Sequence, residues 1–87
     1  MPHYHFHTSD CSPDLEGSEL EDLAAAKCEA VKTAGHVICD AAGTFWDRAE
    51  WTMTVTDEDG LILFILQIVG VESAATQGQH VARLNVA

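Results

Sequence analysis

The stretch from Leu20 to Gly43 constrains the fold most, because its apolar residues recur with the period of one long amphipathic helix. At roughly 100° per residue these residues fall on one side of the helix: Leu23, Ala26, Ala30, Val31, Ala34, Val37, Ile38 and Ala41. The opposite side carries polar residues, namely Glu29, Lys32, Thr33, His36 and Asp40. The pattern predicts a helix with one face packed on a core and the other in solvent.

Both ends of this helix have capping signals. Asp22 is a candidate N-cap, and the alternative is a capping box formed by Ser18 and Glu21 one turn earlier. Gly43 is expected directly after the C-cap, where glycine adopts a positive φ at little cost.

The segments around the helix alternate with the period of strands. In the first of them Tyr4 and Phe6 point to one face, and the intervening histidines point to the other. The predicted strands are residues 3–8, a weak strand over 14–18, residues 51–56 and residues 61–69. We therefore predict an α+β fold, a small antiparallel sheet with one long helix packed on one face (β-β-α-β-β).

The last two strands are predicted to form a hairpin around the turn at residues 57–60, which ends in an Asp-Gly pair. The expected register places Val55 opposite Ile62, Met53 opposite Phe64 and Trp51 opposite Leu66, all facing the helix. The outer face then carries three large aliphatic side chains, Leu61, Leu63 and Ile65. Because monomers rarely expose such a group, we expect a homodimer interface there, with coverage by the C-terminal tail as the alternative.

The length of 87 residues predicts a single small core. We assign residues 1–69 to one α+β domain and residues 70–87 to a tail, which is either an added strand or disordered. In the connector after the helix, Phe45 and Trp46 are expected to pack against the helix end.

The charge balance restricts the partners of this chain. Acidic residues number 14 against 4 basic ones, which gives a formal charge of -10. Nucleic acids and anionic membranes would repel this surface, whereas a basic protein could dock on it. The acidic residues before and at the helix start are the candidate contact, as in an antitoxin-like module: Asp14, Glu16, Glu19, Glu21 and Asp22.

The cysteines and apolar runs bear on location. Three cysteines without a Cys-x-x-Cys pair argue against a disulfide framework and favour the cytoplasm. No apolar run approaches the length of a membrane span, and the N-terminal residues lack the features of a signal peptide.

The sharpest chemical feature is the alternation of His3, His5 and His7. Alternate residues of a strand project to one face, and neutral imidazole is a good ligand for zinc and other transition metals. A His-x-His pair could chelate one ion, with the remaining histidine, Asp10 or Cys11 as a further ligand. The alternative is three exposed histidines on an N-terminal strand.

No arrangement of a nucleophile beside an oriented base is evident, and no glycine-rich phosphate loop occurs. The acidic turn at residues 57–60 lacks the ligand spacing of an EF-hand. We therefore expect a chain that is not an enzyme, without catalytic residues or a required cofactor.

Several motifs match a known pattern. The first motif is an opening strand. It consists of a basic residue, then Tyr-Phe-Phe, then His or Asn, and it corresponds to residues 3–7. The motif Asp-x-Glu-Gly-x-Glu-Leu-x-Asp-Leu is matched at Asp14, Glu16, Gly17, Glu19, Leu20, Asp22 and Leu23. A hairpin motif Val-x-Asp-Glu-x-Gly is matched at Val55, Asp57, Glu58 and Gly60. Over residues 2–68 the chain thus resembles a family of very short bacterial proteins, mainly alphaproteobacterial, whose function is unknown.

This resemblance implies no activity, substrate or cofactor. The prediction from the sequence is therefore an interaction or regulatory module that forms a homodimer. The alternatives are a metal-binding protein that uses the histidine strand, and an antitoxin-like module that binds a basic protein.

Overall fold

The computed structural model describes residues 1–10 and 13–77 of the chain. The strand considered for the end of the tail, and Cys11 as a metal ligand, lie outside the described residues. Within the tail, residues Ala74–Gln77 form a short 3-10 helix, η2.

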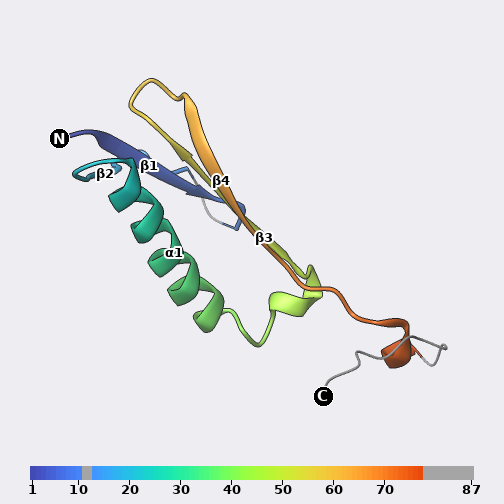
Figure 1. Ribbon diagram of the computed structural model, residues 1–87. Helices are drawn as coiled ribbons and strands as arrows, with labels where there is room; N and C mark the ends of the chain where they lie inside the picture. Colours follow the sequence, from blue (N-terminus) through green and yellow to red (C-terminus); the bar gives the residue numbers. More distant parts are fainter. Residues whose placement is uncertain (11–12, 78–87) are drawn as a thin grey trace, which may run out of the picture.

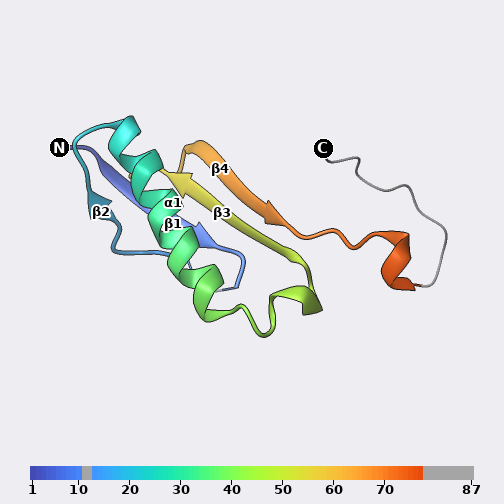
Figure 2. The same cartoon turned by 60° about the horizontal axis from the view of Figure 1, so that its bottom comes forward.

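The chain forms a four-stranded antiparallel sheet with one long helix on one face, so the predicted α+β fold is confirmed (Figure 1). The elements are β1 (His3–Thr8), β2 (Ser18–Glu19), α1 (Leu23–Asp40), the 3-10 helix η1 (Phe45–Asp47), β3 (Glu50–Thr56) and β4 (Ile62–Val69). The strand order is β2-β1-β3-β4. Figure 2 shows α1 over the side of the sheet that holds β2 and β1, with β4 at the far edge.

Helix α1 begins where Asp22 caps it. The Asp22 carboxylate accepts a hydrogen bond from Ala25 N at 2.8 Å, which decides between the two predicted caps. The helix ends at Asp40, and Ala41 is its C-cap. The prediction of a positive φ at Gly43 is wrong, because Ala41 O accepts from Thr44 N and Phe45 N and leads the chain through a turn into η1.

The face of α1 that packs on the sheet is narrower than predicted. Ala26, Ala30 and Ala34 are buried, whereas Leu23 is exposed and Val31 is 62% exposed. The alanine side chains are short, so the helix approaches the sheet closely along this line. Val31 lies round the helix from this line, whereas Leu23 lies on the line but is the first residue of the helix.

The core between helix and sheet contains the residues predicted for the inner face of β3. Trp51, Met53 and Val55 are buried, together with Tyr4 of β1 and the three alanines of α1. Phe6 packs against this cluster from β1. The predicted alternation of β1 and β3 is therefore confirmed.

The hairpin register is shifted by two residues from the prediction. Val55 lies opposite Phe64 and Met53 opposite Leu66, and a bulge at Val55 and Thr56 leaves Leu63 as the extra residue. The turn is wider than the two-residue turn that the prediction implied, because the Asp57 carboxylate accepts hydrogen bonds from Asp59 N and Leu61 N. A shift by two residues keeps the inner face of β4 inward, but Ile62 becomes exposed and Leu63 packs against the core.

Two further predictions need correction. The weak strand expected over residues 14–18 is instead the two-residue strand β2, and Leu15 is exposed. Phe45 packs on the core as expected, but Trp46 lies over the end of β4. A Cβ at Gly70 would be 2.7 Å from the Trp46 ring, so a side chain there would displace the indole.

Candidate functional site

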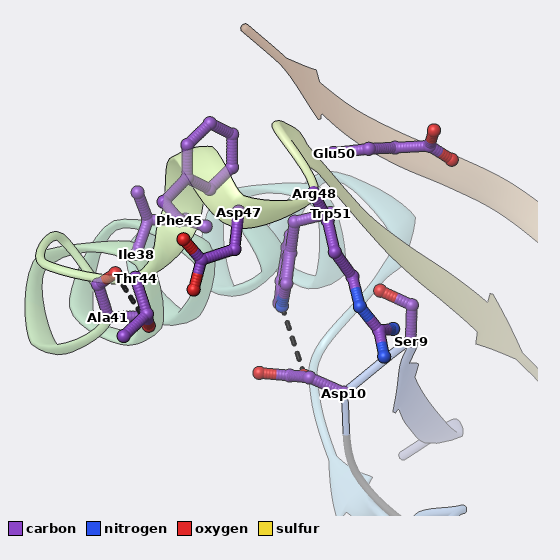
Figure 3. Close-up of a pocket in the computed structure, with 10 residues that line it drawn as sticks. All are labelled: Ser9, Asp10, Ile38, Ala41, Thr44, Phe45, Asp47, Arg48, Glu50 and Trp51. Atoms are coloured by element: carbon purple, nitrogen blue, oxygen red, sulfur yellow. Dashed lines mark hydrogen bonds between the residues drawn. The ribbon is translucent and has the colours of Figure 1, made fainter.

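A cavity opens at the C-terminal end of α1, where η1 and the end of β1 meet (Figure 3). Its volume is about 410 Å³. The residues that line it are Ser9, Asp10, Ile38, Ala41, Thr44, Phe45, Asp47, Arg48, Glu50 and Trp51. Figure 3 shows the Trp51 indole pointing at Asp10, and its Nε1 donates to Asp10 Oδ1 at 3.1 Å.

The described polar residues of this cavity are three carboxylates, one guanidinium and two hydroxyls. Ser9 Oγ accepts a hydrogen bond from Thr52 N at 3.1 Å, and Thr44 Oγ1 donates to the carbonyl of Ala41 at 3.4 Å. Among the described residues that line the cavity there is no histidine, cysteine or lysine to act as a base.

The three histidines lie on the outer face of β1, as predicted, and they hold the segment that follows the strand. His3 Nε2 donates to the carbonyl of Glu16 at 2.6 Å, and His5 Nδ1 donates to the carbonyl of Asp14 at 2.7 Å. His7 Nδ1 accepts from Asp14 N at 3.1 Å, while its Nε2 bonds Thr56 Oγ1 at 3.1 Å. Because His7 accepts through Nδ1, its ring is neutral in this arrangement.

Asp14 closes the same region from the edge of the sheet. Its Oδ2 accepts from Phe6 N at 3.1 Å and its Oδ1 accepts from Gly17 N at 3.0 Å. Burial raises the pKa of the Asp14 carboxyl, but the hydrogen bonds from Gly17 and Phe6 and the nearby His5 outweigh it, so the pKa is lowered. Gly17 has a positive φ of 69°, and a Cβ there would be 2.7 Å from the His3 ring.

These hydrogen bonds change the interpretation of the histidine strand. The rings of His3 and His5 are 5.2 Å apart, and those of His5 and His7 are 6.1 Å apart and stacked. Within residues 1–10 and 13–77, no group of three His, Cys, Asp or Glu side chains is arranged to hold a metal ion. Metal binding by His3, His5 and His7 stays a prediction, and hydrogen bonds to residues 14–16 compete with it.

The residues predicted as an interface lie at the opposite edge of the sheet. Leu61 is 63% exposed and Ile65 is 55% exposed, whereas Leu63 is half-buried against the core. Their role in an interface stays a prediction.

Strand β4 offers more apolar surface than the sequence analysis recognised. Ile62 and Val69 are exposed as well, and the inner residues Phe64, Leu66 and Ile68 are only half-buried. No charged residue occurs between Leu61 and Gly70. This uncharged run is the sequence signal for the surface, because alternation marks only every second residue of a strand.

The acidic residues predicted as a docking surface differ in their exposure and in their hydrogen bonds. Glu16, Glu19, Glu21 and Asp22 are exposed around β2 and the start of α1. Asp14 is occupied by the hydrogen bonds described above.

Residues 3–69 match the model of a domain of unknown function, DUF6894. The chain belongs to this family. Searches of the curated proteins and of the solved structures gave no significant match. The DUF6894 domain thus covers everything from β1 to the end of β4.

In the described part of the chain, no helix has the length and apolar character needed to cross a membrane.

Proposed function

We propose that this DUF6894 protein is a non-enzymatic interaction module that works as a homodimer. The supporting observation is the state of β4, an eight-residue uncharged strand at the edge of the sheet. Exposed apolar edge strands invite pairing with another chain, and folded proteins normally block them with charges, prolines or covering elements. Strand β4 has no charge and no proline, and no element among residues 1–10 and 13–77 covers its edge.

The charge of the chain makes a second copy a suitable occupant. A partner attracted by the formal charge of -10 would approach the acidic segments rather than uncharged β4. The β4 strand of a second copy is also uncharged and apolar, so the two match each other in character. A two-fold arrangement uses the same surface on both subunits and closes at the dimer.

Sedimentation velocity over a range of protein and salt concentrations tests the homodimer. We expect a dimer whose population rises with ionic strength, because salt screens the repulsion between two acidic subunits. A complex with a basic partner would weaken as salt is added. A monomer at every salt concentration, up to high micromolar protein, would contradict the homodimer.

A second candidate function is metal binding by the histidine strand. Its support is the 5.2 Å separation of the His3 and His5 rings on one face, which allows both imidazoles to reach one zinc ion. Isothermal titration with zinc at neutral pH should then show stoichiometric binding that is lost in His5→Ala and kept in His36→Ala. His36 is the matched control because it is exposed on α1. An absence of heat would remove this candidate.

A basic protein partner remains a further proposal, as for an antitoxin-like module. Its support is the exposed acidic group at β2 and the start of α1.

The proposed location for all these roles is the cytoplasm, since Cys28 and Cys39 are exposed free thiols.

A further inference from the structure

We infer that two copies of this chain join their β4 strands edge to edge and antiparallel, with Gln67 opposite Gln67 of the second copy. The two four-stranded sheets would then form one continuous sheet with both helices on the same face. The inference rests on the proposed homodimer and specifies its contact. It replaces the face-to-face contact through Leu61, Leu63 and Ile65 that the sequence suggested.

The hydrogen bonds of β3 show which of its N–H and C=O groups point toward β1 and which point toward β4. Ser9 N donates to the carbonyl of Thr52 at 2.9 Å, so the peptide groups of Thr52 face β1. In an antiparallel sheet, successive residues of a strand turn their peptide groups to opposite sides. The peptide groups of Trp51 and Met53 therefore face β4.

The same alternation fixes the direction of the groups in β4. Ile68 lies opposite Trp51 and Leu66 lies opposite Met53, so Ile68 and Leu66 bond toward β3. Gly70 continues this series, and its N–H donates to the carbonyl of Ala49 at 2.8 Å. The residues that alternate with these turn their N–H and C=O groups to the free edge. They are Ile65, Gln67 and Val69.

The edge is open on this side in the described part of the chain, where β3 is the single strand paired with β4. Ile65 is 55% exposed and Val69 is 61% exposed, so their side chains leave the edge accessible. A second β4 strand would satisfy the outward peptide groups and cover these side chains together.

The choice of Gln67 at the two-fold axis follows from the side chains. This register places Ile65 opposite Val69 on the outer face and Leu66 opposite Ile68 on the inner face, so apolar residues meet apolar residues. The amide of Gln67 can both donate and accept, so two Gln67 side chains can bond each other.

The neighbouring registers are less favourable. A two-fold axis at Ile65 would align Glu58 of the turn with Glu72 of the second copy, which brings like charges together. An axis at Val69 would leave Ile65 beyond the end of the partner strand, which ends at Val69. Gln67 is thus the central residue that best combines apolar contact with separation of the acidic groups.

Cysteine cross-linking tests both the pairing and the register. Gln67→Cys is made in a full-length background in which Cys11, Cys28 and Cys39 are serine, and it is oxidised with glutathione. Two residues facing each other in a hydrogen-bonded antiparallel pair have Cα atoms about 5.5 Å apart, within the range of a disulfide. Ile65→Cys is the matched control, since two copies of that residue would lie more than about 13 Å apart.

The expected result is a disulfide-linked dimer of Gln67→Cys that forms at least tenfold faster than the dimer of Ile65→Cys. Faster cross-linking of Ile65→Cys would overturn the register. Absence of cross-linking in both variants, with a background that sediments as a dimer, would overturn edge pairing and leave the homodimer intact. A background that sediments as a monomer, like the unmodified protein, would contradict the homodimer itself. Circular dichroism confirms that each variant is folded.

Discussion

Strands β1 and β4 lie on the two sides of β3, but they are covered to different degrees. The inner face of β1 lies under α1, and its outer face lies under residues 14–17. Its edge beyond β2 is closed by the Asp14 carboxylate, which accepts from Phe6 N. The edge of β4 has no comparable group in the described residues, and its inner face is only half-buried.

The comparison shows that the polar side chains of β1 bind a covering segment, whereas Gln67 is the one polar residue of β4. Residues 14–17 return over β1, and the histidine side chains of that strand bond the backbone groups of Asp14 and Glu16. The segment after β4 leads away from the sheet (Figure 1). Four predictions test this difference, from the largest expected effect to the smallest.

The largest effect is expected from removing a buried side chain on the β1 side. Tyr4→Ala should lower the free energy of unfolding by about 3 kcal/mol, because a large aromatic side chain leaves a cavity in the core. Ile65→Ala on exposed β4 should cost less than about 1 kcal/mol. Urea denaturation at one low protein concentration measures both values, and equal losses would contradict the described difference in coverage.

A charge on the open edge should weaken the dimer. Val69→Lys should raise the dimer dissociation constant at least tenfold, which corresponds to about 1.4 kcal/mol, since each subunit would place a lysine in an apolar contact. Val31→Lys is the control, because Val31 is 62% exposed on α1 and Val69 is 61% exposed on β4. Equal effects on sedimentation would show that the contact lies elsewhere.

The Asp14 carboxylate should stabilise the fold in a pH-dependent way. Its pKa is lowered in the folded protein, so its contribution is present above the ordinary value of 3.8 and is lost as the pH falls below it. Asp14→Asn should lower the free energy of unfolding by about 1 kcal/mol at neutral pH, because the amide nitrogen cannot accept a hydrogen bond. Urea denaturation from pH 7 to pH 3 should show the two proteins converging; a constant difference would count against this role.

The smallest effect is expected at the histidines. His7→Phe removes the acceptor for Asp14 N and the partner of Thr56, and should cost about 0.5–1 kcal/mol. His36→Phe on the exposed face of α1 should stay within about 0.5 kcal/mol of the parent. Hydrogen exchange should also speed up at residues 14–17 in His7→Phe alone; unchanged exchange there would contradict the role of His7 in holding this segment.

Much of the fold could be predicted from period and capping. The strand over His3–Thr8 and the inner residues of β3 were correct, and Asp22 was one of two predicted caps, because each depends on local spacing or local hydrogen bonds. The hairpin register could not be predicted, because it depends on how the Asp57 carboxylate widens the turn and on the bulge at Thr56.

The candidate sites were less accessible to sequence reasoning. Alternation placed the three histidines on one face, but it could not show that the backbone of residues 14–16 would return to bond them. Strand order decides that β4 has a free edge, and strand order depends on long-range pairing that a sequence pattern does not contain. The uncharged run from Leu61 to Gly70 indicated the location but not the geometry.

The most direct test of the proposed β4 contact is residue-resolved amide hydrogen exchange, measured by NMR at low and high protein concentration. If β4 pairs with β4 of a second copy, the amides of Ile65, Gln67 and Val69 become protected as the concentration rises. The amides of Leu66 and Ile68 bond toward β3 and should be protected at both concentrations. Fast exchange of Ile65, Gln67 and Val69 at every concentration, in a protein that sediments as a dimer, would contradict the account.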